Sequence, residues 1–194
     1  MPRVISVTYL ANIYNYCPID APCLRERIES LIGVKPVIVR VSSREIHLYT
    51  PAPLRDEKKR TLWRRFAPPS TLRDPPCLQG GASRVLCKYE YFMILERYWE
   101  AHEAGEGLWR MGFPGGQLLA VVAGVLAKAQ EGDSRAVEII LDRVLPVVVN
   151  GQAGVGVPFD PIRLRGEAYQ VLACSPGTVP LLTLNAPLLS HRKK

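Results

Sequence analysis

The segment of residues 67–81, APPSTLRDPPCLQGG, constrains the fold more than any other part of this chain of 194 residues. It holds four prolines and two glycines among small polar residues. This composition is typical of linkers, because proline and glycine interrupt both helices and strands. We therefore predict two units, residues 1–66 and residues 82–194, joined by this linker. The alternative is that the two units share one core.

The first unit is predicted to contain a strand, a helix and a β-hairpin, in that order. Two sets of side chains alternate over residues 3–14, which is the period of a strand with one buried face. A helix follows Asp20, which can cap its first turn, and ends at Gly33. The β-rich runs 35–41 and 44–50 predict the hairpin. The side chains expected on the buried face of the strand are Ile5, Val7, Tyr9, Ala11 and Ile13.

The second unit is predicted to be mainly helical at its start. An apolar stripe at helical spacing predicts a helix over residues 83–104, which Gly105 and Gly107 are expected to end. Residues 117–129 are apolar on nearly every side. This pattern predicts a helix buried at the centre of the unit rather than one lying on its surface.

The remainder of the second unit is predicted to contain one more helix and then extended chain. The helix begins at residue 133 or 134, and Pro146 is expected to kink or end it one residue earlier. Short alternating runs at 169–173 and 179–184, separated by prolines, predict edge strands or extended segments. The fold class is therefore α+β: a small strand-helix-hairpin module with a basic helix, followed by a mainly helical module with short extended C-terminal segments.

The basic helix is predicted over residues 55–66, RDEKKRTLWRRF, because acidic residues begin it and two prolines follow it. Cations on several faces of a helix can contact a phosphate backbone, and an exposed ring can stack on bases. The alternatives are a solvated helix with Trp63 and Phe66 in the core, and a surface for an acidic protein partner. The candidate nucleic-acid-binding residues are Lys58, Lys59, Arg60, Trp63, Arg64 and Arg65.

The charge of the chain is concentrated in its first part. The net charge is +7, and residues 1–81 carry 13 basic against 7 acidic residues, a net +6. Residues 82–194 carry 12 basic against 11 acidic residues, a net +1. A basic unit favours an anionic partner. We therefore expect DNA or RNA as the partner of the first unit.

The five cysteines do not have the spacing of a zinc site, which normally uses close pairs with two to four intervening residues. Cys17 and Cys23 are expected to pair if disulfides form, as are Cys77 and Cys87, and Cys174 stands alone. Buried thiols are the alternative. Arginine outnumbers lysine 18 to 7, and asparagine and glutamine total 9. Such a composition suits a heat-adapted protein, in which cytosolic disulfides are common, or a GC-rich genome.

No catalytic, cofactor-binding or metal-binding motif stands out, so we expect no cofactor and no metal. The N-terminus does not resemble a signal peptide, and the longest apolar run, residues 118–127, is too short to span a membrane. We expect a cytoplasmic, non-catalytic nucleic-acid-binding protein or subunit without a membrane partner. The first alternative is an assembly protein, a homo-oligomer or a subunit with a protein partner, that acts through the apolar residues 116–149. The second alternative is an enzyme whose site is dispersed over the fold.

Overall fold

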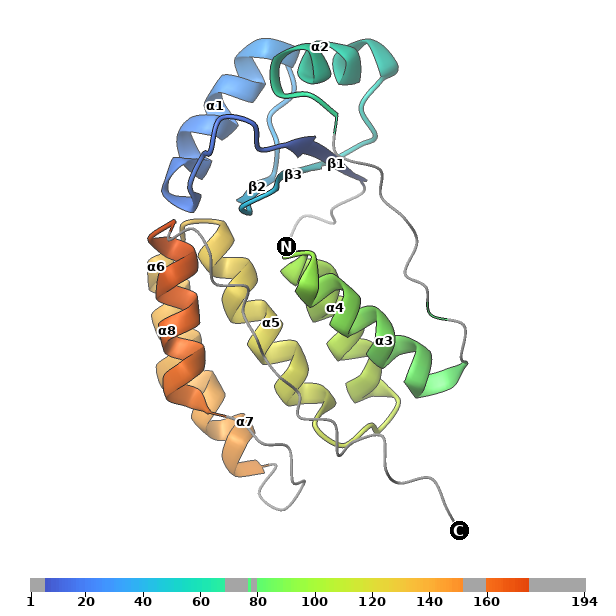
Figure 1. Cartoon of the computed structure of the whole chain (residues 1–194), viewed down its shortest axis with the longest axis vertical. Helices are drawn as coiled ribbons and strands as arrows, with labels where there is room; N and C mark the ends of the chain where they lie inside the picture. Colours follow the sequence, from blue (N-terminus) through green and yellow to red (C-terminus); the bar gives the residue numbers. More distant parts are fainter. Residues whose placement is uncertain (1–5, 69–76, 78–79, 152–159, 175–194) are drawn as a thin grey trace.

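The computed structural model describes residues 6–68, 77, 80–151 and 160–174. These residues form stacked layers, with a sheet between two groups of helices (Figure 1). Helices α1 (Ala21–Ile32) and α2 (Asp56–Phe66) cover one face of the sheet. The helices that follow residue 80 lie on its other side. The predicted α+β fold class is confirmed.

The sheet consists of three antiparallel strands in the order β1-β3-β2. These strands are β1 (Ser6–Ala11), β2 (Ile38–Val41) and β3 (Glu45–Thr50). A 3-10 turn, Pro18–Asp20, leads from β1 into α1. Gly33 ends α1 in the left-handed conformation at φ +61°, which glycine adopts without steric cost. The strand, helix, hairpin and basic helix are all present in the predicted order, but β1 ends at Ala11 and not at residue 14, because the chain turns at residues 12–17.

The two faces of the sheet carry different kinds of side chain. The face toward α1 and α2 is apolar, and its residues form a hydrophobic cluster with Leu62 and Phe66 of α2. Leu10 is the buried member of this cluster on β1. The prediction that Tyr9 and its neighbours form the apolar buried face of β1 is wrong. Tyr9 lies on the opposite face, which carries polar side chains toward the helical part of the chain.

The helical part is built around α5 (Gly116–Gln130), in which 11 of 15 residues are buried. This confirms the predicted central helix. Its neighbours include α3, α4, α7 and α8, and their apolar side chains form a second hydrophobic cluster. The other elements are α3 (Gly81–Ile94), α4 (Tyr98–Arg110), α6 (Ser134–Ile139), α7 (Leu145–Gly151) and α8 (Pro161–Leu172).

The single helix predicted over residues 83–104 is in fact two helices, α3 and α4. The chain turns between them at Glu96, which has a φ of +57°, and the Glu96 carboxylate accepts hydrogen bonds from Ser43. Gly105 and Gly107 were expected to end the helix, but both lie inside α4. A Cβ on Gly105 would come within 2.6 Å of the Ala120 backbone nitrogen. Gly105 therefore allows close packing of α4 on α5 rather than a helix end.

The helix after residue 133 and the C-terminal segments also differ from their predictions. α-Helical hydrogen bonding ends at Ile139, before a π-helical turn, Ile140–Val144, and Pro146 lies in the first turn of α7. A first turn tolerates the missing N–H of proline. Residues 169–173 are not extended, because α8 runs to residue 172. The Asp160 carboxylate caps this helix by accepting from two backbone N–H groups. The predicted segment 179–184 lies outside the described residues.

The two hydrophobic clusters lie on opposite sides of the boundary predicted at residues 67–81, most of which are outside the described residues. That boundary stays a prediction. The first 66 residues and the helical part are in direct contact through polar groups and one disulfide. Among the described helices, none has both the length and the apolar content needed to cross a membrane.

Candidate nucleic-acid interface

Helix α2 forms part of the outer layer of the molecule (Figure 1). Leu62 and Phe66 are completely buried and attach α2 to the cluster formed with α1 and the sheet. Asp56 and Glu57 lie in the first turn of α2, and its last turn is basic. This distribution of charge is favourable for the helix dipole. The helix is therefore held along one narrow stripe, and most of its perimeter faces solvent.

The predicted phosphate-binding cations lie around this solvent-facing perimeter. Arg60, Arg64 and Arg65 are exposed, and Lys58 and Lys59 are half-buried. The Lys59 ammonium is 3.7 Å from the Asp56 carboxylate, an exposed pair of the kind that contributes little stability. Within the part of the chain that the structure describes, Lys58, Arg60 and Arg64 have no acidic partner. Their charges are available to an anion from solution.

Trp63 and Phe66 have different environments, although the sequence groups them together. Phe66 is fully buried, whereas Trp63 is 39% exposed and lies beside the cations. A ring that stacks on a base must be accessible in the free protein. Trp63 meets this requirement. The residues that anchor α2 to the sheet and α1 are Leu62 and Phe66.

An open hollow lies at the N-terminal end of α2. Its walls are mainly apolar, and two of its lining residues, Arg55 and Lys58, are cationic. Such a surface suits a flat group that carries a negative charge. The other lining residues are Val34, Pro51, Ala52, Pro53 and Leu54.

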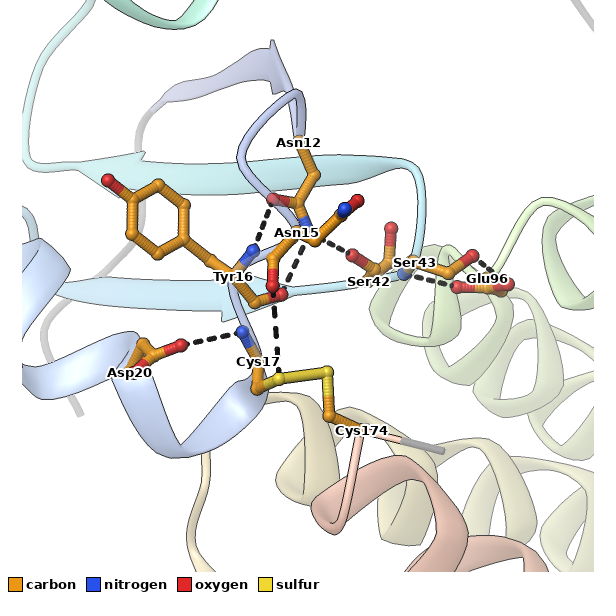
Figure 2. Close-up of a disulfide and its surroundings, with 9 residues drawn as sticks. All are labelled: Asn12, Asn15, Tyr16, Cys17, Asp20, Ser42, Ser43, Glu96 and Cys174. Atoms are coloured by element: carbon orange, nitrogen blue, oxygen red, sulfur yellow. Dashed lines mark hydrogen bonds between the residues drawn. A yellow bond between two sulfur atoms is a disulfide. The ribbon is translucent and has the colours of Figure 1, made fainter. Parts of the chain in front are cut away.

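The structure corrects one of the two predicted cysteine pairs. Cys77 and Cys87 form a disulfide as predicted. Cys17 is bonded to Cys174 (Figure 2) and not to Cys23. Cys23 is a free, exposed thiol on α1. The end of α8 comes beside the 3-10 turn, so that the Cα atoms of Cys17 and Cys174 are 5.2 Å apart. Local spacing in the sequence could not reveal this approach of two distant segments.

A polar layer between the sheet and the helical part was not predicted. The sheet register places Tyr9, His47 and Arg40 in one row across β1, β3 and β2. The Tyr9 hydroxyl donates to Glu100 of α4. The Arg40 guanidinium pairs with Glu131 and lies 4.4 and 4.6 Å from two aromatic ring centroids. The available signal in the sequence was the presence of the polar residues Arg40 and His47 in the middle of the two strands predicted for the hairpin.

Charge pairing continues along this polar layer and shifts several pKa values. Burial alone would raise the pKa of Glu45, but the His47 imidazole, whose Nε2 atom lies 3.6 Å from the Glu45 carboxylate, and the charge of Arg97 hold this pKa below its ordinary value. The Arg97 Nη2 atom donates to Glu45 over 3.0 Å. Burial, and next the charge of Glu100, raise the pKa of Tyr9 far above its ordinary value. Tyr9 therefore stays a neutral hydroxyl donor.

The polar layer has groups that could do chemistry, but its centre, at Arg40 and His47, is closed to solvent. Eight buried side-chain polar atoms in the described residues lack a hydrogen-bond partner, and six of them belong to this layer. They are on Arg40, His47, Tyr49 and Glu100. Arg40 and His47 are at most 1% exposed. A substrate could reach these groups only if the sheet and the helices separated.

One group of side chains in the described residues has the geometry to share a metal ion. The ligand atoms of His102, Glu103 and Glu106 on α4 all lie within 4.8 Å of one another. Two of these residues already have partners. The Glu106 carboxylate pairs with Arg110, and His102 Nδ1 lies 2.8 Å from the carbonyl oxygen of Ala120. These interactions explain the placement of both side chains without an ion.

Comparison of the chain with protein-family models gives no match. The comparisons with curated proteins and with solved structures likewise give none. Two features stand out: the exposed cations and ring of α2, and the closed polar layer beneath the sheet. Only the first of these is accessible to a partner from solution.

Proposed function

We propose that this protein binds nucleic acid without catalysis, through the phosphate backbone and the exposed face of α2. One observation carries the proposal: Arg60 and Arg64 are exposed and have no acidic partner among the described residues, on a helix whose buried anchors are both apolar. Arg60 and Arg64 are one helical turn apart, roughly 6 Å along the axis. They can therefore contact neighbouring phosphates.

The exposed cations of α2 favour an anionic polymer over a single ion as the partner. Each phosphate that a cation neutralises releases condensed counterions from the nucleic acid, and this release drives binding at moderate salt. A row of exposed cations uses this effect repeatedly, without an enclosed pocket. Contacts of this kind do not read the base sequence, so they suit both DNA and RNA.

The cytoplasmic location predicted from the sequence belongs to the same proposal, together with a heat-adapted source. Disulfides are rare in the cytosol of mesophiles and common in intracellular proteins of hyperthermophiles. The two disulfides in the structure therefore fit a cytoplasmic nucleic-acid-binding protein only in the second kind of organism. Preparation of the protein from its own cells under thiol-blocking conditions would show whether both bonds are present there.

The proposal is tested by replacing Arg60, Arg64 and Arg65 with alanine in the full chain. Affinity for labelled DNA and RNA is measured at several salt concentrations. The expected results are weaker binding and a salt dependence whose slope falls by about two to three units, because up to three phosphate contacts are lost. Unchanged affinity and slope would exclude α2 as the interface.

A matched control variant separates the position of the charges from their number. Arg84, Arg135 and Arg143 are exposed residues of the helical part and have no acidic partner within the described chain. Their replacement with alanine lowers the net charge of +7 by the same three units. Near-normal binding by this control is expected. Equal loss in both variants would indicate non-specific attraction to the whole molecule.

The alternative function, that of an assembly protein, is favoured by one set of exposed apolar residues within residues 116–149. Ile139, Val144 and Val147 are exposed in the described structure, whereas α5 is largely covered by the chain's own helices. Measurement of the molecular mass in solution over a range of concentrations tests this function. A monomer at every concentration would count against it.

A further inference from the structure

A second surface element lies beside α2, the turn formed by residues 12–17. Ala11, at the end of β1, donates its backbone N–H to the carbonyl oxygen of Ala67, just after α2. The ring of Tyr16 packs 6.3 Å from that of Phe66. The guanidinium of Arg65 lies 5.6 Å from the centroid of Tyr14. The turn and the C-terminal end of α2 therefore form one continuous surface.

The 12–17 turn is held in a fixed shape by its own polar groups (Figure 2). The Asn12 amide donates to the carbonyl oxygens of Tyr16 and Ser42, at 2.9 and 2.8 Å, and its oxygen accepts the backbone N–H of Tyr16. The disulfide of Cys17 fixes the end of the turn. A surface that is already ordered loses little entropy when it binds a partner.

This fixed turn exposes apolar side chains. Tyr14 is 49% exposed, and its neighbour Ile13 is exposed too. In the described residues, the Tyr14 ring makes an edge-to-face contact with Tyr16, with the ring centroids 5.9 Å apart. The guanidinium of Arg65 lies over the Tyr14 ring, 5.6 Å from its centroid. An exposed ring that is held in place next to a cation is the arrangement that proteins use to stack bases of single strands.

The positions of the rings around α2 define a path for a strand. At about 100° per residue, Trp63 and Arg65 lie about 200° apart around the helix axis. Arg60 and Arg64 project between them on the outer side, away from the buried Leu62 and Phe66. Trp63 therefore flanks the exposed arginines on one side, and Tyr14, beside Arg65, flanks them on the other.

We infer that this composite surface binds single-stranded nucleic acid, with one base stacked on Tyr14, another on Trp63, and the phosphates between them over Arg60 and Arg64. The inference rests on the proposed function and specifies its substrate class. In a duplex the faces of the bases are already stacked on one another, so the two rings have nothing to bind. The protein should therefore prefer a single strand to a duplex of the same sequence.

The test uses the full chain with a labelled short oligothymidine and with the corresponding dA·dT duplex. Replacement of Tyr14 with alanine should weaken binding to the single strand roughly tenfold, as expected when one stacked base is lost. Binding to the duplex should not change. The slope of the salt dependence should also stay as in the unmodified protein, because Tyr14 carries no charge. Tyr14→Phe, which keeps the ring, should bind like the unmodified protein.

The outcomes separate this inference from the proposed function. If single strand and duplex bind equally, or if Tyr14→Ala weakens neither, the inference fails. The proposed function then stands as long as the triple arginine variant has lost affinity. If no nucleic acid binds at all, both fail. Because Tyr14 lies on the surface, the Tyr14→Ala variant should unfold at the same temperature as the unmodified protein. A large decrease in its unfolding temperature would show that binding is lost through misfolding, and would overturn the assignment of Tyr14 as a stacking residue.

Discussion

Arg40 is 1% exposed, with its guanidinium between the rings of Tyr49 and Trp99 and paired with Glu131. An unpaired charge at this depth would cost several kcal/mol. The ion pair and the two rings together compensate for the lost hydration, since a guanidinium is weakly hydrated and stacks well on aromatic faces. Individual charged residues thus hold the sheet against the helices, where an apolar core would be expected.

Glu45 provides a test of this residue-scale argument through pH. Its pKa is lowered in the folded protein, so the ionised form stabilises the fold above the unfolded pKa of about 4.3. This contribution is lost as the pH falls through the lower, folded pKa. We expect Glu45→Gln to be destabilised at neutral pH and to lose less stability than the unmodified protein on acidification. Denaturant unfolding at a series of pH values between neutral and about 3 measures the difference.

The control for Glu45 is Glu29, whose pair with Lys35 is 3.6 Å long and largely exposed. Exposed pairs contribute about 0–1 kcal/mol, so Glu29→Gln should follow the pH dependence of the unmodified protein. A stability difference for Glu45→Gln that does not vary with pH would show that its effect comes from packing and not from its ionisation.

At the scale of elements, the contact between α4 and α5 depends on a missing side chain. A Cβ on Gly105 would lie 2.6 Å from the Ala120 nitrogen, and backbone cannot move aside easily. We expect Gly105→Ala to lower the free energy of unfolding by about 1–3 kcal/mol, the usual cost of overpacking. The measurement is equilibrium unfolding in urea with the disulfides intact.

Gly107, two residues along the same helix, is the matched control. Its added Cβ would meet only the Val85 side chain at 3.6 Å, an ordinary contact. Gly107→Ala should therefore stabilise the protein by up to about 1 kcal/mol, because alanine favours a helix interior. If both substitutions changed stability in the same direction and by the same amount, close packing at Gly105 would not be the cause.

The elements that could be predicted from the sequence are those with a regular local pattern. The glycine that ends α1, the apolar content of α5 and the acidic start of α2 are each visible in a short stretch of the sequence. The break between α3 and α4 at Glu96 could not be predicted in this way. The carboxylate of Glu96 accepts a hydrogen bond from Ser43, which is 53 residues away in the sequence. Asp160 and Pro161 are typical of a helix start, but the alternating residues 169–173 favoured an extended segment over the helix α8 that the structure has.

The candidate site was predictable for the same reason and to the same extent. The cations of α2 all lie within residues 58–65, so their common surface follows from one helix. The proximity of Tyr14 to α2 depends on where β1 ends relative to that helix, and this is a feature of the tertiary structure. The polar layer requires knowledge of which face of the sheet meets the helices. Residues such as Arg40 and His47 indicate only that one face of their strands is not an ordinary apolar surface.

At the scale of the whole molecule, the two disulfides close loops of very different length. Cys17 and Cys174 are 157 residues apart in the sequence, and Cys77 and Cys87 are 10 apart. In the chain-entropy description, closing a longer loop removes more freedom from the unfolded chain. That description gives about 5 kcal/mol for the long loop and about 3 kcal/mol for the short one. The long disulfide also connects the two parts of the molecule that meet at the polar layer.

We therefore expect Cys174→Ser to lower the free energy of unfolding more than Cys87→Ser, by about 2 kcal/mol, under oxidising conditions. Denaturant unfolding of the full chain measures both variants, with and without a reductant. In the presence of reductant all three proteins should have nearly the same stability, because the bonds are then broken in each. Equal losses under oxidising conditions would contradict the argument from loop length. They would show that the stabilisation by the bond between Cys17 and Cys174 does not depend on the length of the loop that it closes.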